Sequence, residues 1–231
     1  ANTNANIAAN SQKDETFAPL GNLMNDDLGS RDKLMKARGL IWYPAETDVS
    51  IRPGWFYHPA DDAKVKTPAS LMDLYFSSVG RNSVLLLNSP PNKEGLISEA
   101  DIRSLRGWRK DLDATFRTNL ASGARIKSPN GRDAKTMLDG NNATNWTTTG
   151  HDTTATVDLT LTGPKTFDVV LLQENIRIGQ RVEKWTLEYK AGSQWKTVTE
   201  GTTIGYKRLL RFPAVTASQV RLRILSSRLN P

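Results

Sequence analysis

The hydrophobic pattern of this 231-residue chain changes at about residue 119, and this change limits the possible folds more than any other feature. Before it, residues 83–88 (SVLLLN) form one continuous apolar run, which is typical of a strand buried on both faces of a parallel sheet. After it, short segments alternate apolar and polar residues between Gly, Pro, Asn and Ser. The pattern predicts an α/β portion over residues 1–118 and an all-β sandwich over residues 119–231, joined near residues 119–129.

The α/β portion alternates predicted strands and helices after a loop-like start at residues 1–30. Strands are expected within residues 40–51 and, after the turn Pro53-Gly54, at residues 54–58 (GWFYH). One helix should begin at Thr67-Pro68 and bury a face formed by Leu71, Leu74, Tyr75 and Val79. A second should be capped by Ser98, with Asp101 three residues on, and bury Ile102, Leu105, Leu112 and Phe116. This order is typical of a parallel α/β unit.

The second portion is expected to form antiparallel strands. The candidates are residues 155–161, 167–174, 184–190, 194–200, 207–212 and 219–225.

Composition excludes several classes of protein. The chain has 38% hydrophobic and 24% charged residues and no apolar run near the roughly 20 residues of a membrane span. Cysteine is absent and the only histidines are His58 and His151, which excludes disulfides and multi-histidine metal centres. The net charge of +7 falls in the second half, mostly as single basic residues along strands. Such spacing is typical of a solvated surface, so we expect no nucleic-acid partner.

The segment PAETDVS places two carboxylates two residues apart. In a strand, Glu46 and Asp48 would point to one face and Thr47 and Val49 to the other. Aromatic residues flank this segment at positions 42, 43 and 55–57. Carboxylates beside aromatic rings suit a sugar-processing site, where an acid protonates a leaving oxygen and rings pack against sugar faces. An exposed loop pair beside an aromatic core would give the same pattern, and the residues alone leave both interpretations open.

Two longer strings, WYPAETDVSIRPGWFYH and SVGRNSVLLLNSPPNKEGLISEADI, resemble the end of the catalytic barrel of glycoside hydrolase family 29, the α-L-fucosidases. The resemblance covers roughly residues 38–105 and is closest to the subgroup that cleaves α-1,3 and α-1,4 fucose. It implies the C-terminal portion of a (β/α)8 TIM barrel and a retaining mechanism. It also implies that Glu46 is the catalytic acid/base and that Trp55 lines the fucose pocket.

Other residues of this segment could line the site or serve only as structural hydrogen-bonding groups. They are Asp48, Arg52, Tyr57 and His58, and Asn88 at the end of the last expected barrel strand has the same two interpretations.

The nucleophile that the family uses, a separate Asp on an earlier barrel strand, has no counterpart in this sequence. Asp48 cannot replace it, because neighbours on one strand face lie side by side rather than across a glycosidic bond. We therefore expect an upstream half of the same enzyme to supply it, with the present chain cut at both ends. The resemblance implies fucosylated glycans as partners and a bacterial periplasmic or extracellular location. The alternative is a non-catalytic carbohydrate-binding fragment.

The segment AKTMLDGNNATNWTT resembles the signature of discoidin-like domains, also called coagulation-factor type C domains, which many hydrolases carry as carbohydrate-binding modules. In this resemblance Asp139-Gly140 forms a turn and Trp146 anchors the sandwich core. Many members hold a structural calcium in this loop, which makes Asp139 and Thr144 candidate ligands. No cofactor is expected for catalysis.

Overall fold

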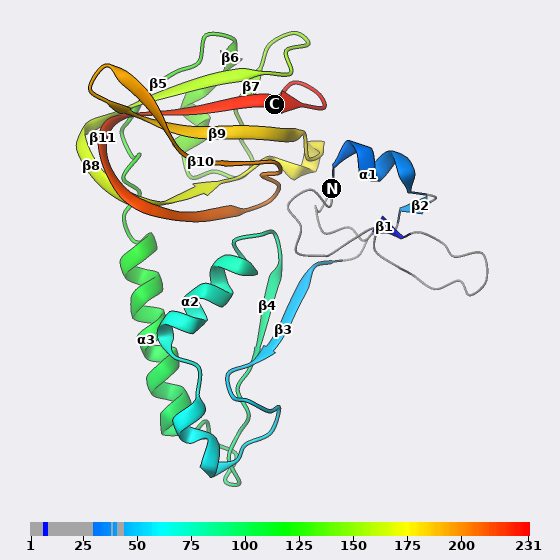
Figure 1. The fold of residues 1–231 in the computed structure, drawn as a ribbon, viewed down its shortest axis with the longest axis vertical. Coiled ribbons are helices and arrows are strands. Elements are labelled where there is room, and N and C mark those ends of the chain that lie inside the picture. Colours follow the sequence, from blue (N-terminus) through cyan, green and yellow to red (C-terminus); the bar gives the residue numbers. More distant parts are fainter. Residues whose placement is uncertain (1–6, 9–29, 38, 41–43) are drawn as a thin grey trace. The chain divides into compact units, whose positions relative to one another are not determined.

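The computed structural model describes residues 7–8, 30–37, 39–40 and 44–231 (Figure 1). The chain divides into two compact units, one of residues Ala45–Asn119 and one that combines Ala1–Pro44 with Leu120–Pro231. No helix of the described residues is long and apolar enough to cross a membrane. Ile41, Trp42 and Tyr43, and with them two of the aromatic residues that flank the carboxylate segment, lie outside the described residues.

The unit Ala45–Asn119 contains the predicted parallel pair of strands (Figure 1). Its elements in chain order are β3 (Glu46–Ser50), the 3-10 helix η1 (Pro59–Lys64), α2 (Pro68–Ser77), β4 (Val84–Asn88) and α3 (Glu99–Phe116). In the parallel register, Glu46 lies opposite Val84 and Ser50 opposite Asn88. The predicted order of strand, helix, strand and helix is therefore confirmed.

Both predicted helix starts are confirmed, because each helix begins where a side chain accepts an otherwise unpaired backbone N–H. Thr67 Oγ1 accepts from the backbone N of Ser70 at 3.2 Å, and Ser98 Oγ accepts from that of Asp101 at 3.4 Å.

The buried faces of the two helices differ from the predicted ones. In α2 the buried residues are Leu71, Met72 and Phe76, so only Leu71 of the expected face is fully buried. In α3 they are the polar residues Asp101 and Ser104. The expected apolar stripe of α3 is partly buried, and Phe116 at its end is 36% exposed.

Two strand predictions in this unit are wrong. Residues 54–58 form no strand; they belong to an irregular loop that follows β3. The apolar run of β4 is not buried on both faces, since Val84 and Leu86 are 61% and 52% exposed. Successive strand side chains point to opposite faces, so the described residues of this unit cover only one face of the β3–β4 pair.

The other unit is built mainly from one antiparallel sheet with strand order β10-β9-β11-β8-β5 (Figure 1). Its bounds are β5 Arg125–Lys127, β8 Ala155–Leu172, β9 Val182–Ala191, β10 Gln194–Gly201 and β11 Arg208–Ser227. The smaller elements are β1 Ile7–Ala8, α1 Arg31–Lys36, β2 Gly39–Leu40, β6 Gly131–Arg132, η2 Ala134–Leu138, β7 Thr147–Thr148 and η3 Ile176–Ile178. The predicted β character of residues 119–231 is confirmed.

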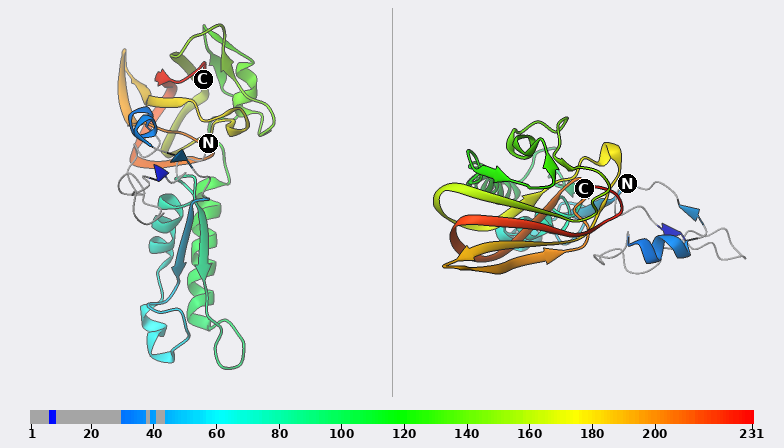
Figure 2. Two further views of the ribbon diagram at one scale, coloured as in Figure 1. Left: turned by 90° about the vertical axis from the view of Figure 1, so that its right-hand side faces the viewer. Right: turned by 90° about the horizontal axis from the view of Figure 1, so that it is seen from above.

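Strands β8 and β11 each join two segments that the sequence separates. Residues 155–161 and 167–174 fall largely within β8, and residues 207–212 and 219–225 within β11. Pairing between them shifts register between Arg211 and Val215 and between Ala217 and Gln219. Such bulges bend strands without ending them, and Figure 2 shows both strands as long curved ribbons. Gly163, which separates two of the predicted strands, lies inside β8.

The core of this unit surrounds Trp185, whose side chain is fully buried with Val157, Leu222 and Ile224. These residues come from alternate positions of β8, β9 and β11, as a sheet with one covered face requires. Trp146, predicted as the anchor, packs against this core while only partly buried. Its indole Nε1 donates to Ser128 Oγ at 3.1 Å.

Candidate functional site

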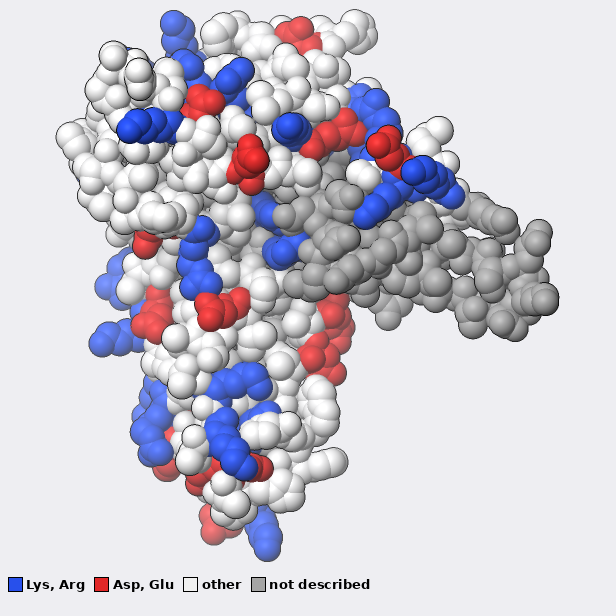
Figure 3. All heavy atoms as spheres, in the orientation of Figure 1, with Lys and Arg blue, Asp and Glu red and all other residues white. Residues whose placement is uncertain are grey.

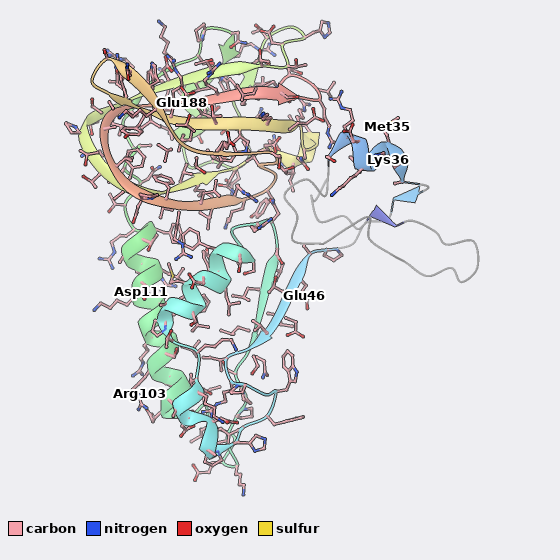
Figure 4. All side chains as sticks on the ribbon, viewed as in Figure 1. Met35, Lys36, Glu46, Arg103, Asp111 and Glu188 are labelled. Atoms are coloured by element: carbon pink, nitrogen blue, oxygen red, sulfur yellow. The ribbon has the colours of Figure 1, made fainter. Side chains whose placement is uncertain are left out.

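The two predicted site carboxylates lie on one face of β3, and both are exposed. Thr47 points to the other face, where its Oγ1 lies 3.0 Å from Ser83 Oγ. The structure thus confirms the strand geometry expected for Glu46 and Asp48, and Figure 4 labels Glu46 on its strand. Both carboxylates are exposed to solvent on this face of the strand.

The same face continues across β4 and to the carboxyl ends of both strands. Opposite Glu46 and Asp48 lie Val84 and Leu86, both more than half exposed. Ser50 follows two residues after Asp48 and is paired with Asn88. Side chains two apart share a face, so carboxylates, apolar side chains and this polar pair form one surface, here called the carboxylate face.

A loop closes the end of the carboxylate face. Ser50 Oγ donates to the carbonyl of Gly54 at 2.7 Å, and Asn88 Nδ2 donates to the carbonyl of Trp55 at 3.0 Å. The loop therefore places Trp55, 52% exposed, beyond the last residue of β3. Glu46 is the first residue of that strand, and four steps of about 3.3 Å separate its backbone from that of Ser50. Asp48 lies between them.

Arg52 does not face solvent; it lies in a buried network with its side chain 0% exposed. Its Nη2 donates to Asp62 at 2.7 Å and to Ser98 at 2.6 Å, and its Nη1 donates to the carbonyl of His58 at 3.2 Å. Its Nε lies 3.1 Å from Oδ2 of Asp101. Burial disfavours the charged form, but the bonds to Asp101 and Asp62 outweigh it and raise the pKa of Arg52.

The predicted site residues of this unit thus fall into two groups. Trp55, Tyr57 and His58 share the loop after β3, with Tyr57 half-buried beneath the Arg52 guanidinium at 4.7 Å and His58 exposed. Glu46 and Asp48 lie along the strand itself. Their binding and catalytic roles stay predictions, because geometry alone assigns none of them.

The sequence reading missed Ser50 and Asp101, which fix these groups in place. A signal for Ser50 was present, since it continues the alternation of Glu46 and Asp48. The sequence indicates Asp101 only as part of a capping signal, and nothing local indicates that it pairs with Arg52, 49 positions away.

The candidate calcium ligands of the other unit lie together in one exposed loop. Thr144 Oγ1 donates to Asp139 Oδ2 at 2.7 Å, and the backbone N of Asn141 donates to Oδ1 at 2.8 Å. These bonds, the one from Asn141 first, lower the pKa of Asp139. The described residues contain no cluster of three or more His, Cys, Asp or Glu able to hold a metal. Calcium at Asp139 and Thr144 stays a prediction.

In the unit that contains residues 120–231, the basic side chains are interspersed with acidic ones. Arg221 forms an ion pair with Asp158 at 2.6 Å, and Arg223 with Glu188 at 3.5 Å. Figure 3 shows Lys and Arg mixed with Asp and Glu on the face in view. This arrangement favours the solvated surface expected from the sequence.

Comparison with known proteins gives each part of the chain a match. Residues 2–112 match the family model Alpha-L-fucosidase, and residues 119–230 match the model F5/8 type C domain. Alpha-L-fucosidase 1 of Arabidopsis thaliana is 39% identical over 204 residues, which cover 84% of this chain and 40% of that protein.

Solved structures agree with these matches. A glycoside hydrolase family 29 fucosidase of Ruminococcus gnavus, in complex with fucose, superposes with a TM-score of 0.75 at 34% identity, covering 82% of this chain and 40% of that one. An α-L-fucosidase homologue of Bacteroides thetaiotaomicron gives a TM-score of 0.79 at 40% identity, covering 89% and 46%. The present chain thus spans less than half the length of these relatives. Residues 2–112 belong to the α-L-fucosidase family, glycoside hydrolase family 29, and residues 119–230 form an F5/8 type C domain, the discoidin-like class.

Proposed function

We propose that this chain is part of a retaining α-L-fucosidase that removes terminal α-1,3- or α-1,4-linked fucose from glycans, with Glu46 as general acid/base. The observation that supports this best is the carboxylate face, where Glu46 and Asp48 are both exposed within the region that matches the family. The loop with Trp55 closes the end of that face and offers an aromatic surface to a sugar ring. The fucose-bound Ruminococcus gnavus relative supports fucose as the ligand class.

In the proposed reaction, the Glu46 carboxyl protonates the glycosidic oxygen as the bond to fucose breaks. A carboxylate on the opposite side attacks the sugar, and Glu46 then takes a proton from the water that releases it. Retaining pairs lie about 5 to 5.5 Å apart across the bond. Asp48 lies beside Glu46 on the same strand face, so it cannot act from the opposite side.

The nucleophilic Asp is therefore proposed to come from upstream polypeptide of the same enzyme. The relatives are more than twice as long as the matched region, which leaves room for such a segment. The parallel order β3-α2-β4-α3 supports the further proposal that the unit Ala45–Asn119 belongs to the C-terminal portion of a (β/α)8 barrel.

Substrate contacts are proposed for Trp55, Asp48, Tyr57 and His58. Arg52 enters this proposal as a support for the loop, since its guanidinium is buried and bonded to Asp62, Ser98 and the His58 carbonyl. The F5/8 type C domain is proposed to bind glycan, with structural calcium at Asp139 and Thr144, and the protein to act in the periplasm or outside the cell.

The test compares Glu46→Gln with the parent protein, each joined to its upstream polypeptide, on a Lewis-type trisaccharide and on an aryl fucoside. Loss of a general acid should slow the trisaccharide about 10²- to 10⁴-fold. An aryl fucoside with an acidic leaving group needs less protonation, so the first step should suffer less. Glu99→Gln, another exposed carboxylate in this unit, is the matched control. Normal trisaccharide turnover by Glu46→Gln would refute the assignment.

The alternative is a carbohydrate-binding fragment without activity, which the match of residues 119–230 to the F5/8 type C domain favours. It predicts glycan binding by the chain and no release of fucose even after the upstream polypeptide is added. Release of fucose that depends on Glu46 decides for the enzyme.

A further inference from the structure

The loop between β3 and β4 is tied to the strands by two polar side chains. Asn88 Nδ2 donates to Ser50 Oγ at 3.1 Å and to the carbonyl of Trp55 at 3.0 Å. Ser50 Oγ donates its own proton to the carbonyl of Gly54 at 2.7 Å. Both N–H groups of the Asn88 amide and the Ser50 hydroxyl proton are thus used, and two successive loop carbonyls are held from the strand ends.

The strands themselves fix the geometry of this clamp. Ser50 and Asn88 are direct partners in the parallel register, and the backbone N of Ile51 donates to the carbonyl of Asn88 at 2.9 Å. Ser50 is 6% exposed, so its hydroxyl is shielded from competing water. The buried Ser50 hydroxyl depends on these partners, because an unmade hydrogen bond in a buried position costs free energy.

Burial of apolar side chains does not explain where this loop lies. Trp55 is 52% and Phe56 78% exposed, so neither ring is packed into a core that would hold the backbone. At the far end of the loop, the buried Arg52 donates to the carbonyl of His58 and lies over the ring of Tyr57. Polar anchors therefore hold both ends, while the rings between them stay open to solvent.

We propose that Asn88, through Ser50 and the Trp55 carbonyl, is the positioning residue for the Trp55 indole. This positioning role rests on the proposed function, because it takes Trp55 as the ring that packs against fucose. Asn88 does not touch the sugar in this proposal. It fixes the backbone from which the indole projects, so that the ring needs little ordering when a pyranose packs on it. This gives the amide at the end of β4 a purpose beyond ending a strand.

Asn88→Asp separates this role from a general packing role. The side chain keeps its size, but the amide nitrogen that donates to both the Trp55 carbonyl and Ser50 Oγ becomes a carboxylate oxygen, which cannot donate to either. The loop should detach and Trp55 should lose its fixed position. Ordering one such side chain on binding costs roughly 0.5 to 1.5 kcal/mol, which corresponds to a two- to twelvefold loss of affinity. Ground state and transition state bind the ring alike, so KM should rise while kcat changes little.

Asn92→Asp is the matched control in the neighbouring loop. Asn92 accepts from the backbone N of Glu94 and of Leu96 through Oδ1, and a carboxylate keeps both bonds. The same chemical substitution should therefore leave fucose binding unchanged. Asn88→Gln should restore part of the affinity, because it keeps the amide donors on a longer side chain.

The experiment uses the protein joined to its upstream polypeptide and measures the fucose Kd by calorimetry, KM and kcat on an aryl fucoside, and hydrogen exchange of residues 53–58. We expect weaker binding and faster exchange of that peptide in Asn88→Asp, with α3 unchanged. If the variant fails to fold, Ser50→Ala answers the same question, since it removes the bond to Gly54, the link to Asn88 and a longer bond from the backbone N of Arg52 at 3.3 Å.

The outcomes are distinguishable. An unchanged Kd in Asn88→Asp and Ser50→Ala, beside a parent that binds fucose, would overturn the positioning role and leave the proposed function standing. A fall in kcat at constant KM would also overturn it. A parent that binds no fucose would refute the proposed function and, with it, the ligand assigned to Trp55.

Discussion

Arg52 and Asp101 form an ion pair in which both side chains are completely buried, with Nε 3.0 Å from Oδ1 and 3.1 Å from Oδ2. Arg52 lies two residues after the end of β3, and Asp101 lies in the first turn of α3. The pair therefore fixes the start of the long helix against the loop that carries Trp55 and Tyr57. Asp62, Ser98 and the His58 carbonyl accept the other hydrogen bonds of the guanidinium.

Asp101→Asn should destabilise this unit strongly, because the neutral amide leaves the buried Arg52 charge without its main partner. Breaking a buried pair costs about 3–5 kcal/mol. Asp113→Asn is the control in the same helix, where Asp113 pairs with Arg109 on the surface and such a pair is worth about 0.3–0.5 kcal/mol. Urea unfolding of both variants measures the difference, and equal free energies of unfolding would contradict the role given to Asp101.

Gly201→Ala should destabilise the unit that contains the five-stranded sheet, because the added methyl group overpacks its core. A Cβ at Gly201 would lie 2.7 Å from Cζ2 and 2.9 Å from Cε2 of Trp185, which is fully buried and has no room to move. Inserted volume of this kind costs about 1–3 kcal/mol. Gly54→Ala meets no atom within 4 Å and is the control. Thermal unfolding of the two variants tests this prediction. A melting temperature for Gly201→Ala as high as that of the parent would contradict it, because the core would then accommodate the methyl group without cost.

Glu174→Gln should weaken the junction at which the segment of Glu174 meets the start of β9 and the loop of Gly205. Oε1 of Glu174 accepts from the backbone N of Arg181 at 2.8 Å and of Val182 at 2.9 Å, and Oε2 accepts from Gly205 N at 2.6 Å. An amide retains one acceptor and turns an N–H toward a backbone donor, which costs about 1–3 kcal/mol. Denaturant unfolding should show this loss, whereas Glu200→Gln on exposed β10 should unfold like the parent. Equal free energies of unfolding for Glu174→Gln and Glu200→Gln would contradict the role given to Glu174.

The loop of Asp139 should add stability that depends on pH. The pKa of Asp139 is lowered below its ordinary value of 3.8, so the ionised carboxylate stabilises the fold above that value. The contribution is lost as the pH falls through the lowered pKa. Thr144→Val removes one of the two bonds and should move the pKa upward, still below 3.8 because the Asn141 N–H remains. An NMR titration of the Asp139 carboxyl measures this; Thr149→Val, whose hydroxyl bonds Asn130, is the control. A pKa that does not move would refute the bond from Thr144.

The sequence by itself determined the elements whose causes are local. Caps at Thr67 and Ser98 set the starts of α2 and α3, and alternation placed Glu46 and Asp48 on one face of β3. These features depend on neighbours within a few residues, so periodicity and capping chemistry suffice to predict them. The β character of residues 119–231 follows in the same way from its repeated alternation.

The tertiary structure alone decided which distant groups meet. Arg52 pairs with Asp101 and Asn88 bonds the Trp55 carbonyl, yet 49 and 33 positions separate them. Gly163 separates two segments that the sequence predicts as separate strands, but residues 155–160 and 165–172 both pair with β11, so one long strand spans them. Trp185, not Trp146, is the fully buried indole of the core, because residues of β8 and β11 that are distant in the sequence pack around it. Local patterns specify direction and face, whereas the free energy of burying a charge, a carbonyl or a ring depends on the partners that the fold brings to it.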